Sequence, residues 1–122
     1  MSYLAIFLGG GFGSLCRFAL SHFNSNSIIL PIGTIAANFL SCIVLAFVTA
    51  LIATKSDLPY AFKAFFAIGF CGGFSTFSTF SLETYNLLRK GEAFWAFANV
   101  GFSMLICLVA LYIGFYLHKI IM

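Results

Sequence analysis

Five hydroxyl side chains fall within seven residues, one residue after a pair of glycines, in the segment Gly-Phe-Cys-Gly-Gly-Phe-Ser-Thr-Phe-Ser-Thr-Phe-Ser at 69–81. Polar groups in an apolar span are costly and usually face a partner or a cavity. Glycine is a weak helix former and hydroxyls compete for backbone hydrogen bonds, so we expect a helix that opens near Gly72–Gly73. Open backbone there must lie against protein or an aqueous cavity. The alternative is a continuous helix whose hydroxyls bond to i−4 carbonyls.

Two other segments carry polar residues at helical spacing, so that each set lies on one helix face. The sets are Thr34, Asn38 and Ser41, and Asn99, Ser103 and Cys107. A single stripe of this kind more often holds helices together than lines a conduit. Two stripes beside an opened, hydroxyl-rich helix make a conduit an equally good interpretation.

The candidate conduit offers hydroxyl and amide donors but no acidic residue at the centre of a span. Glu83 is the nearest acid, and it lies towards an end of its segment. Cation paths usually carry rings of Asp or Glu, and proton-coupled pumps carry a carboxylate within the membrane. Phe77 and Phe80 interleave the hydroxyls, and aromatic ring edges are partly positive. These features favour a small anion.

The elements that must position these residues are membrane helices. The 122 residues are 62% hydrophobic and 7% charged, with a mean hydropathy of +1.09. A soluble domain carries about 25% charged residues, so this class is excluded. At roughly 20 residues per spanning helix, the chain holds about four helices and no separate catalytic domain. We therefore expect no enzyme, and the scattered charges predict no nucleic-acid partner.

Charged and turn-forming residues divide the chain into four spans, expected at 3–23, 31–54, 60–88 and 93–119. Short loops join them, so both termini should lie on the same side of the membrane. The fold class is all-α integral membrane, with residues 1–122 forming one four-helix domain and the third helix broken at the membrane midplane. Gly9/Gly13 and Gly10/Ser14 are small pairs four residues apart and predict a close helix-packing face. The four cysteines have no metal-ligand spacing and are interpreted as small hydrophobic residues.

Lysine and arginine are balanced between the two sides of this arrangement. One side holds Lys55, Lys63 and Lys119, and the other holds Arg17, Arg89 and Lys90. Membrane orientation normally follows an excess of these residues on one side. Without an excess, a chain can insert in both directions, and two opposed copies can pair as an antiparallel homodimer. The alternative is that counts this small carry no information.

Three motifs resemble the signatures of the CrcB/Fluc fluoride channel family. They are Gly9-Gly10-x-x-Gly13-Ser14-x-x-Arg17-Phe18, Gly33-Thr34-x3-Asn38, and Gly69-Phe70-Cys71-Gly72-Gly73-Phe74-Ser75-Thr76-Phe77-Ser78-Thr79-Phe80. The motifs follow the family's order over the first three spans, and the third is highly specific. The resemblance departs at three positions: Ser75 and Ser41 replace a usual threonine and glycine, and Asn99 stands at a usual tyrosine.

The resemblance implies an antiparallel, dual-topology homodimer in the cell membrane, whose two pores export fluoride passively and relieve its toxicity. It also implies a structural sodium ion, not transported, held by the backbone carbonyls of Gly72 and Ser75. The pore asparagine would be Asn38 and the stacked pore phenylalanines Phe77 and Phe80. Further ion-pathway candidates are Ser78, Thr79 and Ser103, and then Thr34, Ser41, Asn99, Glu83 and Arg17.

Two rival functions remain at this point. A small multidrug-type, proton-coupled transporter also has four helices and can insert in both directions, but it requires a glutamate within the first span. This sequence has Arg17 there and no acidic residue. A membrane assembly subunit that transports nothing would not need an opened, hydroxyl-rich helix.

Overall fold

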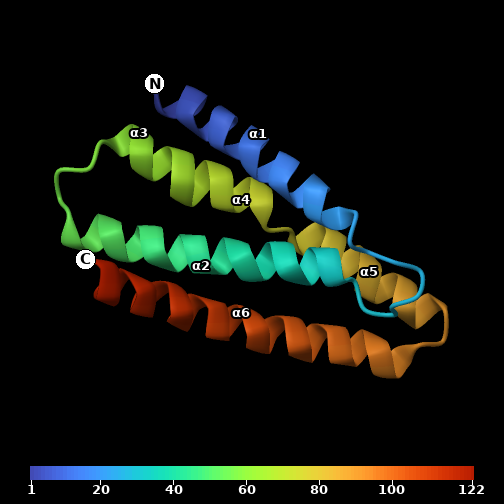
Figure 1. Cartoon of the computed structure of the whole chain (residues 1–122). Coiled ribbons are helices and arrows are strands. Elements are labelled where there is room, and N and C mark those ends of the chain that lie inside the picture. Colours follow the sequence, from blue (N-terminus) through green and yellow to red (C-terminus); the bar gives the residue numbers. More distant parts are fainter.

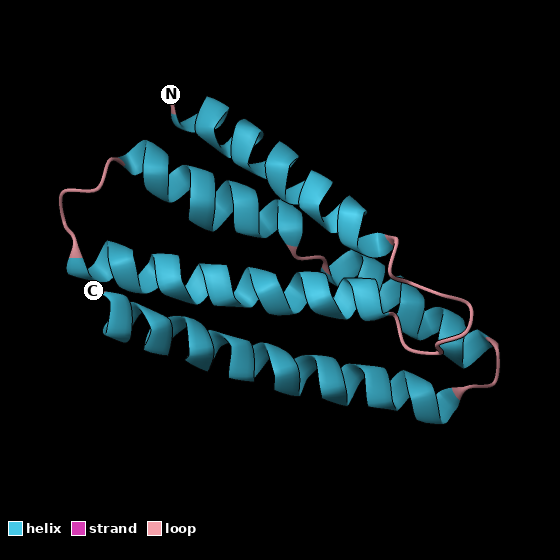
Figure 2. Cartoon of the chain, in the orientation of Figure 1, coloured by secondary structure: helices cyan, strands magenta, loops and turns pink.

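The computed structural model describes all residues, 1–122, and contains helices but no strands (Figure 2). The elements are α1 (Ser2–Ser21), α2 (Ile32–Thr54), α3 (Tyr60–Lys63), η1 (Ala64–Phe70), α4 (Cys71–Phe74), α5 (Phe77–Arg89) and α6 (Ala93–Ile121). Elements α3 to α5 follow one another as a single long segment, so the chain forms four antiparallel rods with both termini at one end (Figure 1).

Each of the four rods is long and apolar enough to cross a membrane. The 23 residues of α2 span about 34 Å at 1.5 Å per residue, against a hydrocarbon core of about 30 Å. The expected spans differ from the observed helices by at most two residues at either end. Proline explains one of these boundaries. Pro31 is the N-cap of α2, and a proline disfavours helical backbone at the residue before it, so the helix does not extend further towards the N-terminus.

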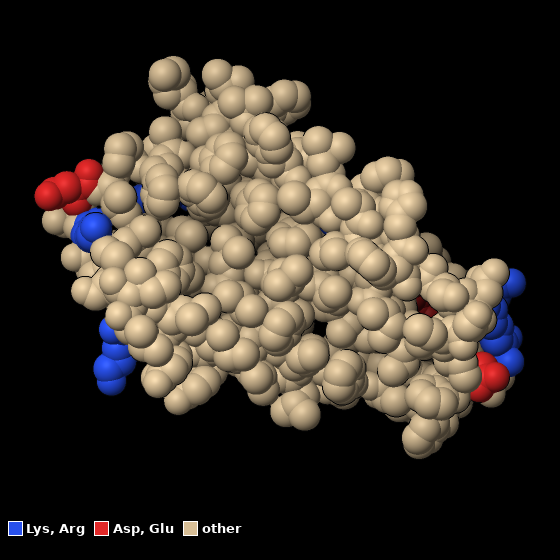
Figure 3. Space-filling view, in the orientation of Figure 1, with Lys and Arg blue, Asp and Glu red and all other residues tan.

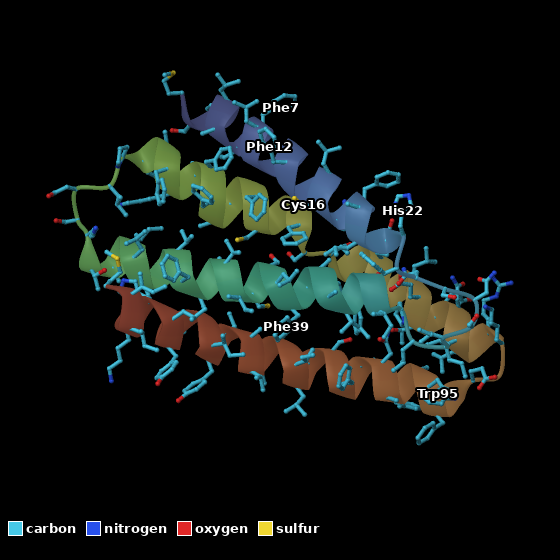
Figure 4. The ribbon with its side chains drawn as sticks, viewed as in Figure 1. Phe7, Phe12, Cys16, His22, Phe39 and Trp95 are labelled. Carbon is cyan, nitrogen blue, oxygen red and sulfur yellow. The ribbon has the colours of Figure 1, made fainter.

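Charge and apolar surface are distributed as a membrane protein requires. Figure 3 shows the charged side chains of this face at the two ends of the bundle, with uncharged side chains between them. Large apolar side chains cover the outer surface, among them Phe7 on α1, which is 76% exposed, and Tyr112 on α6, which is 71% exposed. Figure 4 shows Trp95 in the first turn of α6, close to the end of the bundle where aromatic residues commonly meet the membrane interface.

Glycines allow α1 to lie directly against the third segment. A Cβ added to Gly9 would meet the Phe65 carbonyl oxygen, and one added to Gly13 would meet that of Phe70. Gly9 and Gly13 are the buried residues of α1. The predicted packing face of small residues is therefore confirmed, and its partner is the backbone of η1 and α4.

The third segment opens at Ser75 and Thr76, not at the two glycines. Ser75 has a ψ of 158° and Thr76 has φ −154° and ψ 115°, so both are extended, while α4 ends at Phe74 and α5 begins at Phe77. The expected opening is therefore displaced: it begins two residues beyond Gly73, because both glycines are helical. Gly73 serves helix contact instead, since a Cβ there would meet the Gly10 carbonyl oxygen.

A seven-residue π-helix precedes this opening and was not expected from the sequence. It covers Ala64–Phe70, where carbonyls bond to amides five residues on. Three phenylalanine rings follow one another through and beyond it, with centroids 6.4 Å apart for Phe66 and Phe70 and 5.4 Å apart for Phe70 and Phe74. π-helical turns frequently occur near functional sites.

Candidate functional site

All three polar residues of the α2 stripe bond to the third segment. The Thr34 hydroxyl donates to Glu83 Oε1 at 2.7 Å, and the Ser41 hydroxyl donates to the Cys71 carbonyl at 3.0 Å. Ser41 is only 2% exposed, so the serine that replaces a usual glycine fits the helix interface as a hydrogen-bond donor. This stripe therefore holds α2 against α4 and α5.

Asn38, the middle residue of the stripe, binds the backbone of the opening. Its Oδ1 accepts from the Thr76 amide at 2.8 Å, and its Nδ2 donates to the Thr76 carbonyl at 3.4 Å. A buried amide without a partner costs about 1–3 kcal/mol. The Asn38 side chain thus replaces the helical hydrogen bond that the Thr76 amide has given up.

The carbonyls of Gly72 and Ser75 lose their helical donors at the same place. In an uninterrupted α-helix these carbonyls would accept from the amides of Thr76 and Thr79. The Thr76 amide donates to Asn38 instead, and the Thr79 amide donates to the Thr76 hydroxyl at 3.2 Å. The opening therefore frees two carbonyl oxygens that are three residues apart.

A cavity of about 650 Å³ adjoins the opening between α2, α5 and α6. It brings together four of the residues predicted for the ion pathway, Asn38, Phe77, Phe80 and Ser103. The rings of Phe77 and Phe80 have centroids 5.8 Å apart and are tilted by 42°. Phe77 is 80% exposed on the single chain, so this cavity is open on one side.

Ten lining residues of this cavity were not predicted for the ion pathway, although one of them, Ser75, was predicted as a sodium ligand. They are Cys42, Ser75, Thr76, Ser81, Thr84, Tyr85, Leu88, Val100, Met104 and Cys107. A usable signal was present for some of them, because Cys42, Ser81 and Thr84 each stand one helical turn after a predicted residue. Cys107 was placed on a polar stripe but not proposed for the pathway.

A second cavity, of about 300 Å³, lies on the other side of the opening. It collects Arg17, Thr34, Thr79 and Glu83, all candidates for the ion pathway, and it shares Thr76 with the first cavity. Arg17 is the cationic residue of its lining and Glu83 the anionic one. Ser78 lines neither cavity, and its hydroxyl lies 3.3 Å from that of Thr76.

A third cavity, of about 530 Å³, lies at the end of the bundle formed by the 22–31 loop and the α5–α6 turn. Asn86 and Lys90 are among its lining residues, and it shares Glu83 with the second cavity. Glu83 Oε2 is buried without a hydrogen-bond partner. The three cavities therefore form a series linked by Glu83 and Thr76.

In the α6 stripe, Asn99 forms a contact between helices, whereas Ser103 lines the first cavity. Asn99 is fully buried, and its Nδ2 donates to the Thr84 hydroxyl at 3.0 Å. The Ser103 hydroxyl donates to Asn99 Oδ1 at 3.4 Å and also lines the first cavity. Asn99 thus joins α6 to α5, and its hydrogen bond to the Ser103 hydroxyl orients that side chain.

A known protein family matches almost the whole chain, including the residues of this arrangement. Residues 4–115 match the family described as CrcB-like protein, Camphor Resistance (CrcB). The chain belongs to the CrcB family. With four helices of membrane length, this CrcB protein is a multi-pass protein of the cell membrane.

Curated relatives resemble the CrcB chain over almost its full length. It is 39% identical to the fluoride-specific ion channel FluC of Pyrococcus horikoshii, over 93% of each chain. It is 40% identical to that of Thermococcus onnurineus, over 95% of this chain and 94% of the relative. A bacterial FluC from Serratia proteamaculans is 39% identical over 95% and 92% of the two chains. The family resemblance seen in the motifs is thereby confirmed.

Proposed function

We propose that this CrcB protein is a fluoride channel that lets the ion leave the cell passively. The observation that carries the proposal is the cavity beside the opened helix, which presents Asn38, Phe77, Phe80 and Ser103 and no carboxylate. The relatives named as fluoride-specific ion channels support the choice of ion.

The lining of this cavity suits a small, strongly hydrated anion. Hydroxyl and amide donors replace water around the ion, and in surroundings of low dielectric constant such bonds are stronger than in water. The partly positive edges of the Phe77 and Phe80 rings attract the anion at positions that no hydroxyl group reaches. A larger halide would need a wider passage to reach the same donors, which gives selectivity against chloride.

Flux through this path is uncoupled. Glu83 is the one acidic residue within the four rods, and its Oε1 accepts a hydrogen bond from Thr34. It lines the second and third cavities and not the first, which holds Phe77 and Phe80. A proton-coupled transporter of the multidrug type requires a glutamate in the first span, where this chain has Arg17, so that alternative is disfavoured.

The functional unit is an antiparallel homodimer. The three-to-three balance of cationic residues between the two sides supports insertion in both directions. Phe77 is 80% exposed and Tyr85 is 58% exposed on the single chain, and both line the first cavity, which is open on this side. A second copy would close the cavity there. The alternative of a membrane assembly subunit would leave this polar lining without a use.

A structural sodium ion would suit the carbonyls of Gly72 and Ser75. Both lack the helical amide that would otherwise bond to them, because Thr76 and Thr79 donate elsewhere. Gly72 has no neighbouring atom within 4 Å of an added Cβ, so its surroundings leave room for a second subunit. Four carbonyl oxygens from two copies are neutral, hard ligands, and a bound sodium ion would supply the positive charge that compensates them.

Flux from liposomes tests the function. Purified protein is reconstituted into liposomes loaded with potassium fluoride or potassium chloride, valinomycin is added, and ion-selective electrodes record efflux. We expect rapid fluoride efflux and chloride efflux at the level of protein-free liposomes. Equal efflux of the two ions, or no fluoride efflux from well-folded protein, would overturn the proposal.

A further inference from the structure

Two cysteines from different helices lie in the cavity that holds the pathway phenylalanines. Cys42 follows Asn38 by one turn on α2, and Cys107 follows Ser103 by one turn on α6. Both line the cavity of about 650 Å³, both are free thiols, and the helices that carry them, α2 and α6, pack against each other. Each of the two polar stripes thus continues to a thiol in the same cavity.

The surroundings of this pair determine which ligand it can take. No group of three or more His, Cys, Asp or Glu side chains gathers in the chain, whereas a structural zinc site needs four ligands. Soft ions prefer sulfur ligands, and the mercuric ion forms stable, linear complexes with only two thiolates. The pair therefore suits a soft, two-coordinate ion.

We propose that Cys42 and Cys107 form a binding site for a soft divalent ion of the mercuric class, which bridges their sulfur atoms inside the cavity. Each thiol releases its proton to water as one sulfur–metal bond forms, and no oxidation state changes. The bridged group is neutral, so its burial in the cavity carries no cost for a buried charge. Bridging also ties α2 to α6 across the cavity and blocks the path beside Phe77 and Phe80. The block rests on the proposed channel function, whereas binding of the ion does not.

The other two cysteines provide matched controls. Cys16 is exposed on α1 and lies outside the cavity. Cys71 is buried on α4, with 3% of its surface exposed, and does not line the cavity either. Replacement of Cys16 or Cys71 by alanine should therefore leave the bridge intact.

The binding test uses the purified protein in detergent with one equivalent of mercuric chloride. Unbound metal is removed with a weak competing thiol, and free thiols are then counted under denaturing conditions alongside intact mass. We expect one mercury per chain and two protected thiols in the wild type, in Cys16→Ala and in Cys71→Ala. Cys42→Ser and Cys107→Ser should retain no mercury after the wash, while eluting from a sizing column like the wild type.

The flux test uses the same variants in liposomes. Mercuric chloride should lower wild-type and Cys16→Ala fluoride efflux at least tenfold, and dithiothreitol should restore it. Cys42→Ser and Cys107→Ser should each keep more than half of their own untreated efflux.

Mercury retained by Cys42→Ser, lost from Cys71→Ala, or found as a covalent link between two chains would overturn the site. Mercury bound by the pair in a protein without flux would support the site and refute the channel. Fluoride flux in a wild-type protein that retains no mercury would support the channel and refute the metal site.

Discussion

The side chain of Asn38 on α2 holds the backbone of Thr76 through two hydrogen bonds, 2.8 Å from the Thr76 amide to Oδ1 and 3.4 Å from Nδ2 to the Thr76 carbonyl. The two residues are 38 positions apart in sequence. Their contact stabilises the extended backbone between α4 and α5, and the same asparagine lines the cavity with Phe77 and Phe80. One residue thereby positions the opening and presents polar atoms to the proposed ion path.

Replacing Asn38 separates these two roles. Asn38→Asp keeps an acceptor for the Thr76 amide, but it removes the Nδ2 donor and adds a negative charge that repels fluoride. We expect near-wild-type thermal unfolding in detergent and loss of flux. Asn38→Leu leaves the amide without its partner and should lower stability by about 1–3 kcal/mol. Wild-type flux in Asn38→Asp would contradict a path beside this residue.

The phenylalanine rings should matter through their electrostatics as well as their size. Phe77→Ile and Phe80→Ile roughly keep side-chain volume and remove the partly positive ring edge. Aromatic interactions contribute about 0.5–1.5 kcal/mol, so each change should lower fluoride flux roughly tenfold in the liposome assay. The matched control is Phe12→Ile on the outer surface of α1, where Phe12 is 57% exposed. Equal effects of the three substitutions would show that the ring edges carry no specific role.

Glycines of α1 offer a test of helix packing within one element. Gly9→Ala places a methyl group against the Phe65 carbonyl oxygen, whereas Gly11 has no atom within 4 Å of an added Cβ. We expect Gly9→Ala to destabilise the protein by about 1–3 kcal/mol because the backbones must separate. Gly11→Ala should be neutral, or stabilising by up to about 1 kcal/mol, because alanine is the better helix former. Thermal unfolding of both variants in the same detergent provides the measurement.

Dual insertion predicts a simple complementation experiment. Lysines added at the terminal end of the bundle, beside Lys119, should fix one orientation and lower flux, because opposed copies become rare. Lysines added beside Lys90, at the opposite end, should fix the other orientation. Co-expression of the two variants should restore flux. Thiol labelling from each side of the membrane measures orientation, and a single orientation in active wild-type protein would refute the antiparallel dimer.

Removal of sodium tests the carbonyl site. Exchange of sodium on both sides for N-methylglucamine, which is too large for a site built from four carbonyls, should lower dimer stability and fluoride flux together. Returning sodium should restore both, because backbone carbonyls remain in place when the ion leaves. Unchanged flux and dimer stability after prolonged exchange, together with only water at this position in a crystallographic map, would rule out the ion.

The sequence by itself determined the membrane class, the extents of the four rods and the glycine face of α1. Hydropathy fixes the first two because a span must be both long and apolar, and residues four apart always share a helix face. It also identified Asn38, Phe77, Phe80 and Ser103, which meet in one cavity. These features depend on local spacing, which a sequence displays directly.

Only the tertiary structure decided where the third segment opens and which polar residues line a cavity. Local propensity pointed to Gly72–Gly73, yet the chain opens at Ser75 and Thr76, because a distant asparagine supplies the hydrogen bonds that extended backbone needs. Gly73 remains helical where it contacts α1. Asn99 is buried against Thr84 instead of lining the cavity, whereas Cys42 and Cys107 both line it. The rotation of each packed helix decides this, because it selects the partner of every side chain on the helix surface.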